Sequence, residues 1–209
     1  MSLLELLQAR RSVRRFKPDA IPRETVERLV EAAVAAPSAS NKQPWRFVAV
    51  TDRATIAKMA AGVREAVDRI ARHIEPASAA SFRGYGSYFT RFEDAPLVLV
   101  ALCKRLTVLS NLVGESLPAD DRSRIEAMER GSALIGAAMA MQNLLLMAHD
   151  LGLGASGMTG PLVAVDRIRA ILEVPESWDV AALVPVGRPD EAPTPTERKS
   201  VSAVLRWIE

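Results

Sequence analysis

The stretch PLVLVALC runs from Pro96 to Cys103 and is apolar throughout, without the alternation of apolar and polar residues that marks a half-exposed strand. Strands that are covered on both faces have this uninterrupted pattern. We therefore expect a strand in the middle of a sheet here. Two further strands are predicted at Trp45–Val50, which is rich in aromatic and β-branched residues, and at Val180–Val186.

Helical patterns surround these strands. Leucines recur at helical spacing after Ser2, a good N-cap, and Asp52 is expected to cap the helix that follows the first strand. Helices are predicted at Leu3–Arg10, Pro22–Pro37, Asp120–Leu151 and Asp166–Glu173, with an extended tail at Pro189–Pro195. The helix from Asp120 is polar in its first half and apolar nearly all round from Ala133 onward, so its second half is expected to be the core helix.

The composition fits a single domain over residues 1–209, because 49% hydrophobic residues can bury a sizeable core. A net charge of +2 gives no general positive field, so nucleic acid is not expected as a partner. One cysteine, Cys103, allows neither an internal disulfide nor a multi-cysteine metal site, and no metal is expected. A single cysteine also suits a reducing compartment, so the expected location is cytoplasmic.

No membrane segment or cleaved signal peptide is expected. The apolar start of the chain precedes its arginines and is interrupted by Glu5 and Gln8, which reverses the charge-first order of a signal peptide. The most apolar stretch, Ser132–Met147, is shorter than the roughly 20 residues that a spanning helix needs.

Two cationic clusters stand near the ends of the chain. RRSVRRF, residues 10–16, places four arginines and a hydroxyl after the first helix, and ERKS, residues 197–200, lies in the tail. Guanidinium groups are fork-shaped donors to phosphate oxygens, and a dianionic phosphate monoester fits such a cradle best. A solvated basic turn or a weak nucleic-acid patch explains the first cluster equally well, and a solvated tail explains the second.

Two further segments carry small, polar or glycine residues. In PSASNKQPW, residues 37–45, hydroxyls and amides offer donors and acceptors to a polyol or heterocycle, although ordinary capping and turns also use them. GLGASGMTGP, residues 152–161, contains a formal G-x-G-x-x-G. Its context excludes a dinucleotide fold, because a helix precedes it and Pro161 follows. Glycines here suit either close backbone approach to a flat ligand or a plain helix-ending loop.

Taken in order along the whole chain, RRSVRRF, APSASNKQPW, GLGASGMTGP and VGRPDEAPTPTERK resemble the nitroreductase family. The resemblance implies an α+β fold with a mixed central β-sheet flanked by helices. It also implies a homodimer around long helices, with the C-terminal segment reaching onto the partner and FMN held between the subunits.

The resemblance also implies the residues that bind FMN. Arg10, Arg11, Ser12 and Arg14 would hold the phosphate, ribityl chain and pyrimidine edge, with Arg198, and Lys199 in a shifted register, at the phosphate. The other subunit would contribute its own residues at Pro37, Ser38, Ser40 and Asn41, and Gln43 belongs to the same cofactor-binding set. Gly157, Met158, Thr159 and Gly160 would lie beside the isoalloxazine, with the amides of Thr159 and Gly160 near N5 and O4. Thr159 stands where some relatives carry glutamate.

The activity implied is hydride transfer from NAD(P)H to flavin N5, followed by transfer to a small nitroaromatic, quinone or flavin acceptor in the same place, with ping-pong kinetics. The flavin performs the chemistry, so no residue is assigned as an acid or base. Residues 75–125 are expected to form an excursion, irregular and mobile over Glu75–Phe92, whose aromatic residues either cover the flavin or pack as satellite core. The candidate lid residues are Phe82, Tyr85, Tyr88 and Phe89, together with Phe92.

Two minor expectations and three alternatives complete the sequence-based hypotheses. His73 and His149 are both expected on helices, and Cys103 is expected to be a buried small hydrophobe. One alternative is a specialised member of the same fold, such as a dehalogenating, dehydrogenating or flavin-cleaving enzyme. The others are a non-catalytic flavin-binding or ligand-sensing protein, and a nucleic-acid binder that uses RRSVRR.

Overall fold

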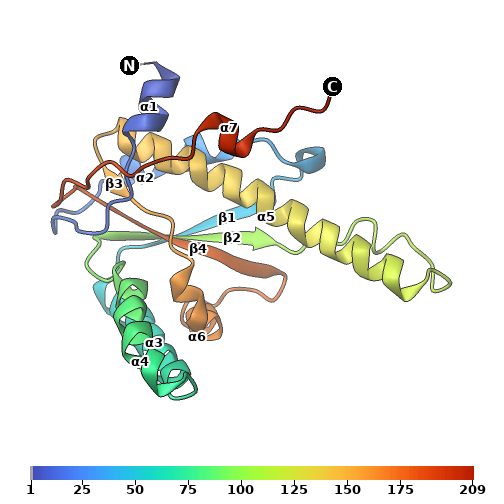
Figure 1. Cartoon of the computed structure of the whole chain (residues 1–209), viewed down its shortest axis with the longest axis horizontal. Coiled ribbons are helices and arrows are strands. Elements are labelled where there is room, and N and C mark those ends of the chain that lie inside the picture. The colour runs from blue at the N-terminus through green and yellow to red at the C-terminus, as the bar shows by residue number, and fades with distance from the viewer. Residues whose placement is uncertain (1) are drawn as a thin grey trace.

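A computed structural model describes residues 2–209 as a four-stranded sheet with helices on both faces (Figure 1). The strands are β1 (Trp45–Val50), β2 (Leu97–Lys104), β3 (Gly154–Ala155) and β4 (Trp178–Gly187). Their order across the sheet is β1-β2-β4-β3. All residues of β2 except the last are buried, and it pairs with a neighbour on each side. The predicted central, doubly covered strand is therefore confirmed, as is the α+β class.

The named strands pair only in antiparallel fashion. Within residues 2–209, the one parallel pairing is the isolated bridge between Ser12 and Ala155. The expected mixed character of the sheet is thus confined to the place where the N-terminal segment joins its edge. Strand direction depends on which strands become neighbours, and local sequence pattern does not encode that.

Ten helical elements surround the sheet in the described part of the chain. They are α1 (Leu3–Ala9), α2 (Arg23–Val34), η1 (Ala39–Asn41), α3 (Arg53–Ala71), α4 (Pro76–Gly86), η2 (Ser87–Thr90), α5 (Ala119–Asp150), η3 (Gly160–Ala164), α6 (Val165–Ile171) and α7 (Val201–Val204). Figure 1 shows α2 and α5 on one face of the sheet, with α3, α4 and α6 on the other. The predicted caps are confirmed: Ser2 forms a capping box with Glu5, and the Asp52 side chain accepts from the backbone N–H of Thr55.

Alternate residues of β2 divide the core in two. Leu97 and Leu99 belong to the cluster under α5, whereas Val98 and Val100 belong to the cluster under α3. This division follows from the two-residue period of a strand, which turns successive side chains to opposite faces. Both faces of the central strand are therefore buried away from water, which explains its continuous apolar sequence.

The long helix α5 is the only helix of residues 2–209 that is long and apolar enough to cross a membrane by length and composition. In this fold, small residues of its second half, including Ala137 and Ala140, are buried together with Leu99 of the sheet. The prediction that the second half of this helix is the core helix is confirmed.

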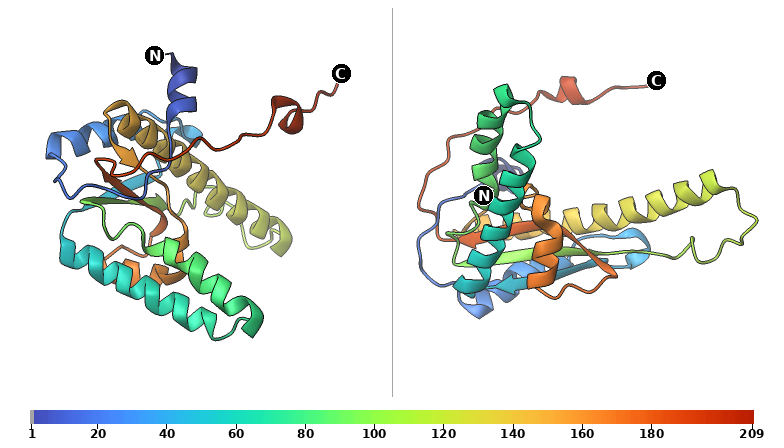
Figure 2. Two further views of the ribbon diagram at one scale, coloured as in Figure 1. Left: turned by 60° about the vertical axis from the view of Figure 1, so that its left-hand side comes forward. Right: turned by 90° about the horizontal axis from the view of Figure 1, so that it is seen from below.

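The predicted irregular excursion is wrong for residues 76–86, which form α4. This helix packs on α3 as a hairpin (Figure 2), and Gly86 permits the contact, since a Cβ there would lie 2.5 Å from Val67 Cγ1. Tertiary packing thus stabilises a segment whose own periodicity is weak. The histidine prediction is also wrong at His73, which lies in the turn after α3, whereas His149 is on α5 as predicted.

Candidate functional site

Backbone hydrogen bonds join three segments that are distant in sequence. The N–H of Val13 donates to the carbonyl of Ala155 over 3.1 Å, and the N–H of Lys17 donates to the carbonyl of Arg188 over 2.9 Å. Residues 12–17 therefore run as an extended segment between the glycine-rich segment (residues 152–160) and the start of the C-terminal tail. The carboxylate of Glu191 reinforces this pairing by accepting from the N–H of Arg14 at 2.5 Å.

This pairing creates a cationic hollow of about 390 Å³ beside α1. Its lining consists of Arg10, Arg11, Ser12, Arg14, Pro193, Thr194, Thr196 and Arg198. Residues from the two ends of the chain, predicted to act together, are thus brought to one place. Lys199, the shifted-register candidate, is exposed and does not line the hollow.

The electrostatics of the hollow favour an anion. Burial, followed by repulsion from Arg198 and Arg11, lowers the pKa of the Arg10 guanidinium. None of the lining residues, within the described range 2–209, is acidic. Among the described residues, none of the arginine side chains of the hollow forms an ion pair, so a bound anion would relieve their mutual repulsion.

Arg11 carries the clearest sign of a missing partner. Its Nη1 donates to the carbonyls of Gln8 and Arg10, but its Nε is buried without a hydrogen-bond partner. A buried donor left unpaired costs on the order of 1–3 kcal/mol, and more when the group is charged. An oxygen-rich ligand in the adjoining hollow would remove that cost.

From Ser156 to Thr159, the glycine-rich segment alternates buried and exposed residues. Met158 is buried and exchanges two backbone hydrogen bonds with Leu183, at 2.8 and 3.0 Å. Its amide is therefore bonded to β4 and its side chain packs in the core, because extended backbone turns every second residue inward. Its place beside the cofactor stays a prediction. Gly157 and Thr159 are exposed, and their N–H groups have no backbone partner among residues 2–209. The segment thus presents outward-facing donors along one edge.

Glycines at both ends of this segment accept close neighbours. A Cβ on Gly154 would lie 2.6 Å from Cγ1 of Val13, so a larger residue would push the N-terminal segment away. A Cβ on Gly160 would overlap the ring of Phe89. Close approach, rather than a dinucleotide fingerprint, explains these two glycines.

The amide loop (residues 37–43) is held in an unusual conformation. Ser40, Asn41 and Gln43 have φ values of 49°, 50° and 46°, in the left-handed region that non-glycine residues rarely adopt. The Ser38 hydroxyl accepts from the N–H of Gln43 at 2.9 Å and stabilises the turn. Backbone strain of this kind persists where surrounding structure imposes it, and it is frequent at binding sites.

The amide loop does not reach the cationic hollow of its own chain. It lies against the middle of α5, where a Cβ on Gly136 would be 3.6 Å from Cβ of Ser38. The hollow instead lies beyond the end of α5, next to Ala155 and α1. Between Gly136 and Asp150 the helix rises roughly 20 Å. Within one chain, the two groups of predicted cofactor ligands therefore belong to separate places.

The candidate lid residues divide into two groups. Phe82 and Phe89 are half-buried against the core cluster under α3, and Phe92 is fully buried in it. Tyr85 and Tyr88 are exposed, by 64% and 53%. The phenylalanines therefore pack as satellite core. Of the candidate lid residues, only the two tyrosines face outward.

Sequence reasoning did not single out several residues that the structure places at or near the site. Pro193 and Thr194 line the cationic hollow. Thr196 lines the hollow and its hydroxyl accepts from Nη1 of Arg198 at 2.5 Å. Ser156 is fully buried, and its hydroxyl has no partner within residues 2–209. Arg91 lies beside Tyr88. All of these residues except Arg91 fall inside quoted motifs, so their residue types were visible but their orientation was not.

Comparison with known protein families and sequences gives a consistent result. The family model described as the nitroreductase family matches residues 7–188. An NADH dehydrogenase of Thermus thermophilus is 32% identical, covering 95% of this chain and 92% of the relative. A 5,6-dimethylbenzimidazole synthase of Rhodospirillum rubrum is also 32% identical, covering 91% and 83%. An iodotyrosine deiodinase of Haliscomenobacter hydrossis is 31% identical, covering 96% and 86%.

Solved structures show the same fold. A BluB-like flavoprotein from Clostridium difficile superposes with a TM-score of 0.88 at 24% identity and full coverage of both chains. A nitroreductase with bound FMN from Desulfitobacterium hafniense has a TM-score of 0.74 at 20% identity, covering 99% of this chain and 97% of the other. At these identities the likeness concerns the fold alone.

Proposed function

This chain belongs to the nitroreductase family, and on that premise we propose that it is an FMN-dependent oxidoreductase that carries electrons from NAD(P)H to a small aromatic acceptor. The observation that carries the proposal is the cationic hollow, which is lined by Arg10, Arg11 and Arg198 and adjoins the glycine-rich segment through the hydrogen bond between Val13 and Ala155. A ligand that joins a phosphate to a flat heteroaromatic ring matches both features.

The residues present fit FMN. Guanidinium forks from Arg11 and Arg198 suit a phosphate dianion, and the unpaired Nε of Arg11 would gain an acceptor. The hydroxyls of Ser12 and Thr196 would supply the remaining polar contacts of the phosphate and ribityl chain. The bound flavin would supply the hydride chemistry, which is the part that protein side chains cannot provide.

The chain's own groups would bind and orient. The N–H groups of Gly157, Thr159 and Gly160 would donate to the polar edge of the ring and hold it against the sheet edge. Donors fixed in this way stabilise negative charge that develops on the ring, without rearrangement during the reaction. Because no side chain is needed for proton transfer at the ring, one open face would serve NAD(P)H and acceptor in turn.

We further propose a homodimer in the cytoplasm, with the amide loop of a second copy completing each site. Support comes from the separation of this loop from the hollow and from the tail, whose end projects away from the body (Figure 2). Trp207 and Ile208 of the tail are 75% and 87% exposed. Large apolar side chains in such a position indicate a protein surface that covers them.

The direct test is the absorption spectrum of the purified protein, recorded before and after anaerobic addition of NADH or NADPH. We expect a yellow protein with flavin bands that bleach on addition of either nucleotide and return with a nitroaromatic or quinone. A colourless protein that takes up no added FMN would contradict the proposal, and salt-sensitive DNA binding by such a protein would favour the nucleic-acid alternative.

A second candidate function is a specialised reaction on the same fold, either dehalogenation or cleavage of the flavin itself. The relatives named iodotyrosine deiodinase and 5,6-dimethylbenzimidazole synthase favour it as strongly as the NADH dehydrogenase favours the first. Incubation with excess NADPH in air separates these functions. Repeated turnover of menadione with FMN retained supports the general oxidoreductase, whereas permanent loss of the flavin bands supports flavin cleavage. Halide release from a halophenol, without turnover of menadione, supports dehalogenation.

A further inference from the structure

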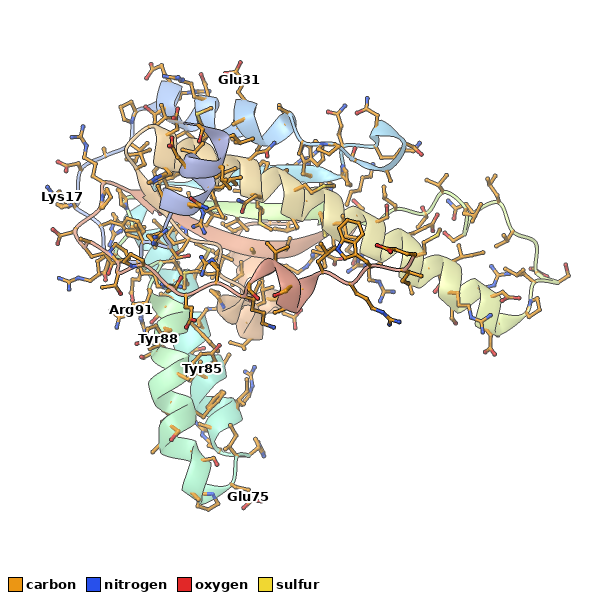
Figure 3. All side chains as sticks on the ribbon, turned by 45° about the horizontal axis from the view of Figure 1, so that its top comes forward. Lys17, Glu31, Glu75, Tyr85, Tyr88 and Arg91 are labelled. Carbon is orange, nitrogen blue, oxygen red and sulfur yellow. The ribbon has the colours of Figure 1, made fainter. Side chains whose placement is uncertain are left out.

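Tyr85, Tyr88 and Arg91 form a row on the outer side of the segment that runs from α4 into η2 (Figure 3). They are spaced three residues apart, with Tyr85 on α4, Tyr88 on η2 and Arg91 at the C-cap of η2. The Cζ atom of Arg91 lies 5.3 Å from the ring centroid of Tyr88, within the range of a cation–π contact. The row thus combines two exposed rings with a cation.

Phe89 fixes this row beside the glycine-rich segment. Its ring occupies the space over Gly160, and it meets the Tyr85 ring edge to face with centroids 5.1 Å apart and planes at 79°. Tyr85 therefore lies next to Gly160 through Phe89, and Tyr88 lies on η2, which packs against η3 just after the outward-facing amides of Gly157 and Thr159. An acceptor lying on a flavin held by those amides would come within reach of the row.

The charge of Arg91 is free to meet a ligand. Glu93, two residues away, pairs with Arg64 at 2.5 Å, and Asp94 lines a separate hollow with Arg53. Within residues 2–209, Arg91 makes no ion pair. The guanidinium is thus oriented by an aromatic ring and neutralised by no carboxylate.

We propose that this row selects aromatic acceptors that carry an acidic group, a carboxylate or sulfonate. The aromatic ring of the acceptor would contact Tyr85 and Tyr88, and its acidic group would bind the guanidinium of Arg91. The inference rests on the proposed function, because the acceptor must reach a bound flavin. Aromatic stacking holds the ring of the acceptor, and a charge-assisted hydrogen bond to the guanidinium stabilises only an acceptor that has an acidic group. The phosphates of NAD(P)H are the other anions that visit the same place.

The test compares para-nitrobenzoate with para-nitrobenzamide in the holoenzyme, with Arg91→Gln as the variant and Arg83→Gln as the matched control. Arg83 lies on α4 and faces Asp68 at 3.9 Å. We expect the ratio of kcat/KM for the acid over the amide to fall about tenfold in Arg91→Gln, mainly through KM. Arg91→Lys should recover part of the ratio, and Arg83→Gln should leave it unchanged. Comparing the variant with wild type cancels the different intrinsic reactivity of the two compounds.

Rapid mixing separates the acceptor from the nucleotide. Flavin reduction by NADPH and by NADH is followed in the absence of acceptor, and we expect both rates to be the same in wild type and Arg91→Gln. A fall with either nucleotide would assign Arg91 to a nucleotide phosphate and overturn the proposal. An unchanged acid-to-amide ratio would overturn it as well.

A binding measurement tests the row when turnover is absent. Benzoate and benzamide are titrated into the oxidised holoprotein, and the change in flavin absorbance or fluorescence gives each dissociation constant. Wild type should prefer benzoate, and Arg91→Gln should lose that preference. Equal affinity in wild type contradicts the selection of acids, whereas a protein that takes up no FMN contradicts the proposed function itself.

Discussion

Two parts of the candidate site are held in opposite ways. Residues 12–17 are bonded on both sides within their own chain, to Ala155 on one side and to Arg188 on the other. The amide loop is bonded mainly to itself, through Ser38 and Gln43, and leans on the middle of α5. Residues 12–17 thus belong to a part of the candidate site, the cationic hollow, that one chain assembles by itself. The amide loop lies on a separate surface of the same chain.

The tail shows the same contrast within one segment. Its first residues close the cationic hollow, as Arg198 does, whereas its last residues leave the body with apolar side chains exposed (Figure 2). Each chain therefore assembles a cationic hollow and exposes its amide loop and the end of its tail. In a two-fold dimer, the exposed segments of one copy could complete the site of the other.

The largest effect is expected from removing residues 200–209, which deletes the exposed part of the tail and leaves Arg198 in place. Burying an apolar side chain contributes roughly 1.5–3 kcal/mol, so losing several should raise the dimer dissociation constant about a thousandfold or more. Analytical ultracentrifugation over a range of concentrations measures this. Serine at Trp207 and Ile208 in the full-length chain should give a smaller change in the same direction. Dimers of unaltered affinity after truncation would show that the tail lies outside the interface.

The next largest effect is expected in the cationic hollow. Arg11→Ala combined with Arg198→Ala should weaken FMN binding by about a hundredfold to ten-thousandfold, because each hydrogen bond from a charged group contributes about 1.5–3 kcal/mol. Flavin fluorescence titration reports the dissociation constant. The control replaces Arg23, an exposed arginine of α2, and Arg83 by alanine. Flavin that stays stoichiometric through gel filtration of the hollow variant would refute the phosphate assignment.

Two glycine substitutions sharpen the comparison at the level of one segment. Gly154→Ala should lower the free energy of unfolding by about 1–3 kcal/mol, since the new methyl group overlaps Val13. Gly157→Ala meets no atom within 4 Å, so the flavin-free protein should stay within about 0.5 kcal/mol of wild type while its FMN affinity falls. Urea unfolding and flavin titration of both variants give the two quantities. Equal destabilisation by both would mean that the segment is not divided into an inward and an outward side.

The smallest effect is expected on stability, at the segment of residues 105–118, which is hydrogen-bonded to Glu129 of α5. This buried carboxylate accepts from the Ser110 hydroxyl at 2.6 Å and from the N–H groups of Val108 and Leu109 at 2.7 and 2.5 Å. The hydrogen bond from Ser110, followed by those from the backbone, lowers the pKa of Glu129 from its ordinary value of 4.5.

Because the folded-state pKa of Glu129 is depressed, its stabilisation is fully present above about pH 4.5 and is lost as the pH falls through the lowered folded value. Glu129→Gln should therefore be less stable than wild type near pH 7, and this difference should shrink on acidification. Urea unfolding of both proteins at a series of pH values measures it. A stability difference independent of pH would mean that the charge of Glu129 is immaterial.

Several local features followed directly from residue patterns. The uninterrupted apolar run at Pro96–Cys103 predicted the central strand, and the change in α5 at Ala133 predicted where that helix becomes buried. Cys103 is a buried thiol whose pKa is raised by burial, in keeping with its expected role as a small hydrophobe. In each case one residue type or period has a single low-energy environment, so sequence suffices.

Other features had no local signal. α4 is stabilised by packing at Gly86, and its weak periodicity predicted an irregular segment instead. β3 is only two residues long and exists because residues 12–17 and β4 flank it. The inward turn of Met158 depends on its pairing with Leu183. These outcomes were set by neighbours that are remote in sequence.

The sequence by itself determined which groups are available: arginines near both ends, a glycine-rich segment after a core helix, and a buried central strand. Only the tertiary structure decided that Arg11 and Arg198 share one hollow and that the amide loop stands apart from it. Residue chemistry is encoded locally, whereas proximity depends on long-range hydrogen bonds such as those from Val13 and Lys17, and no local period reveals these in advance.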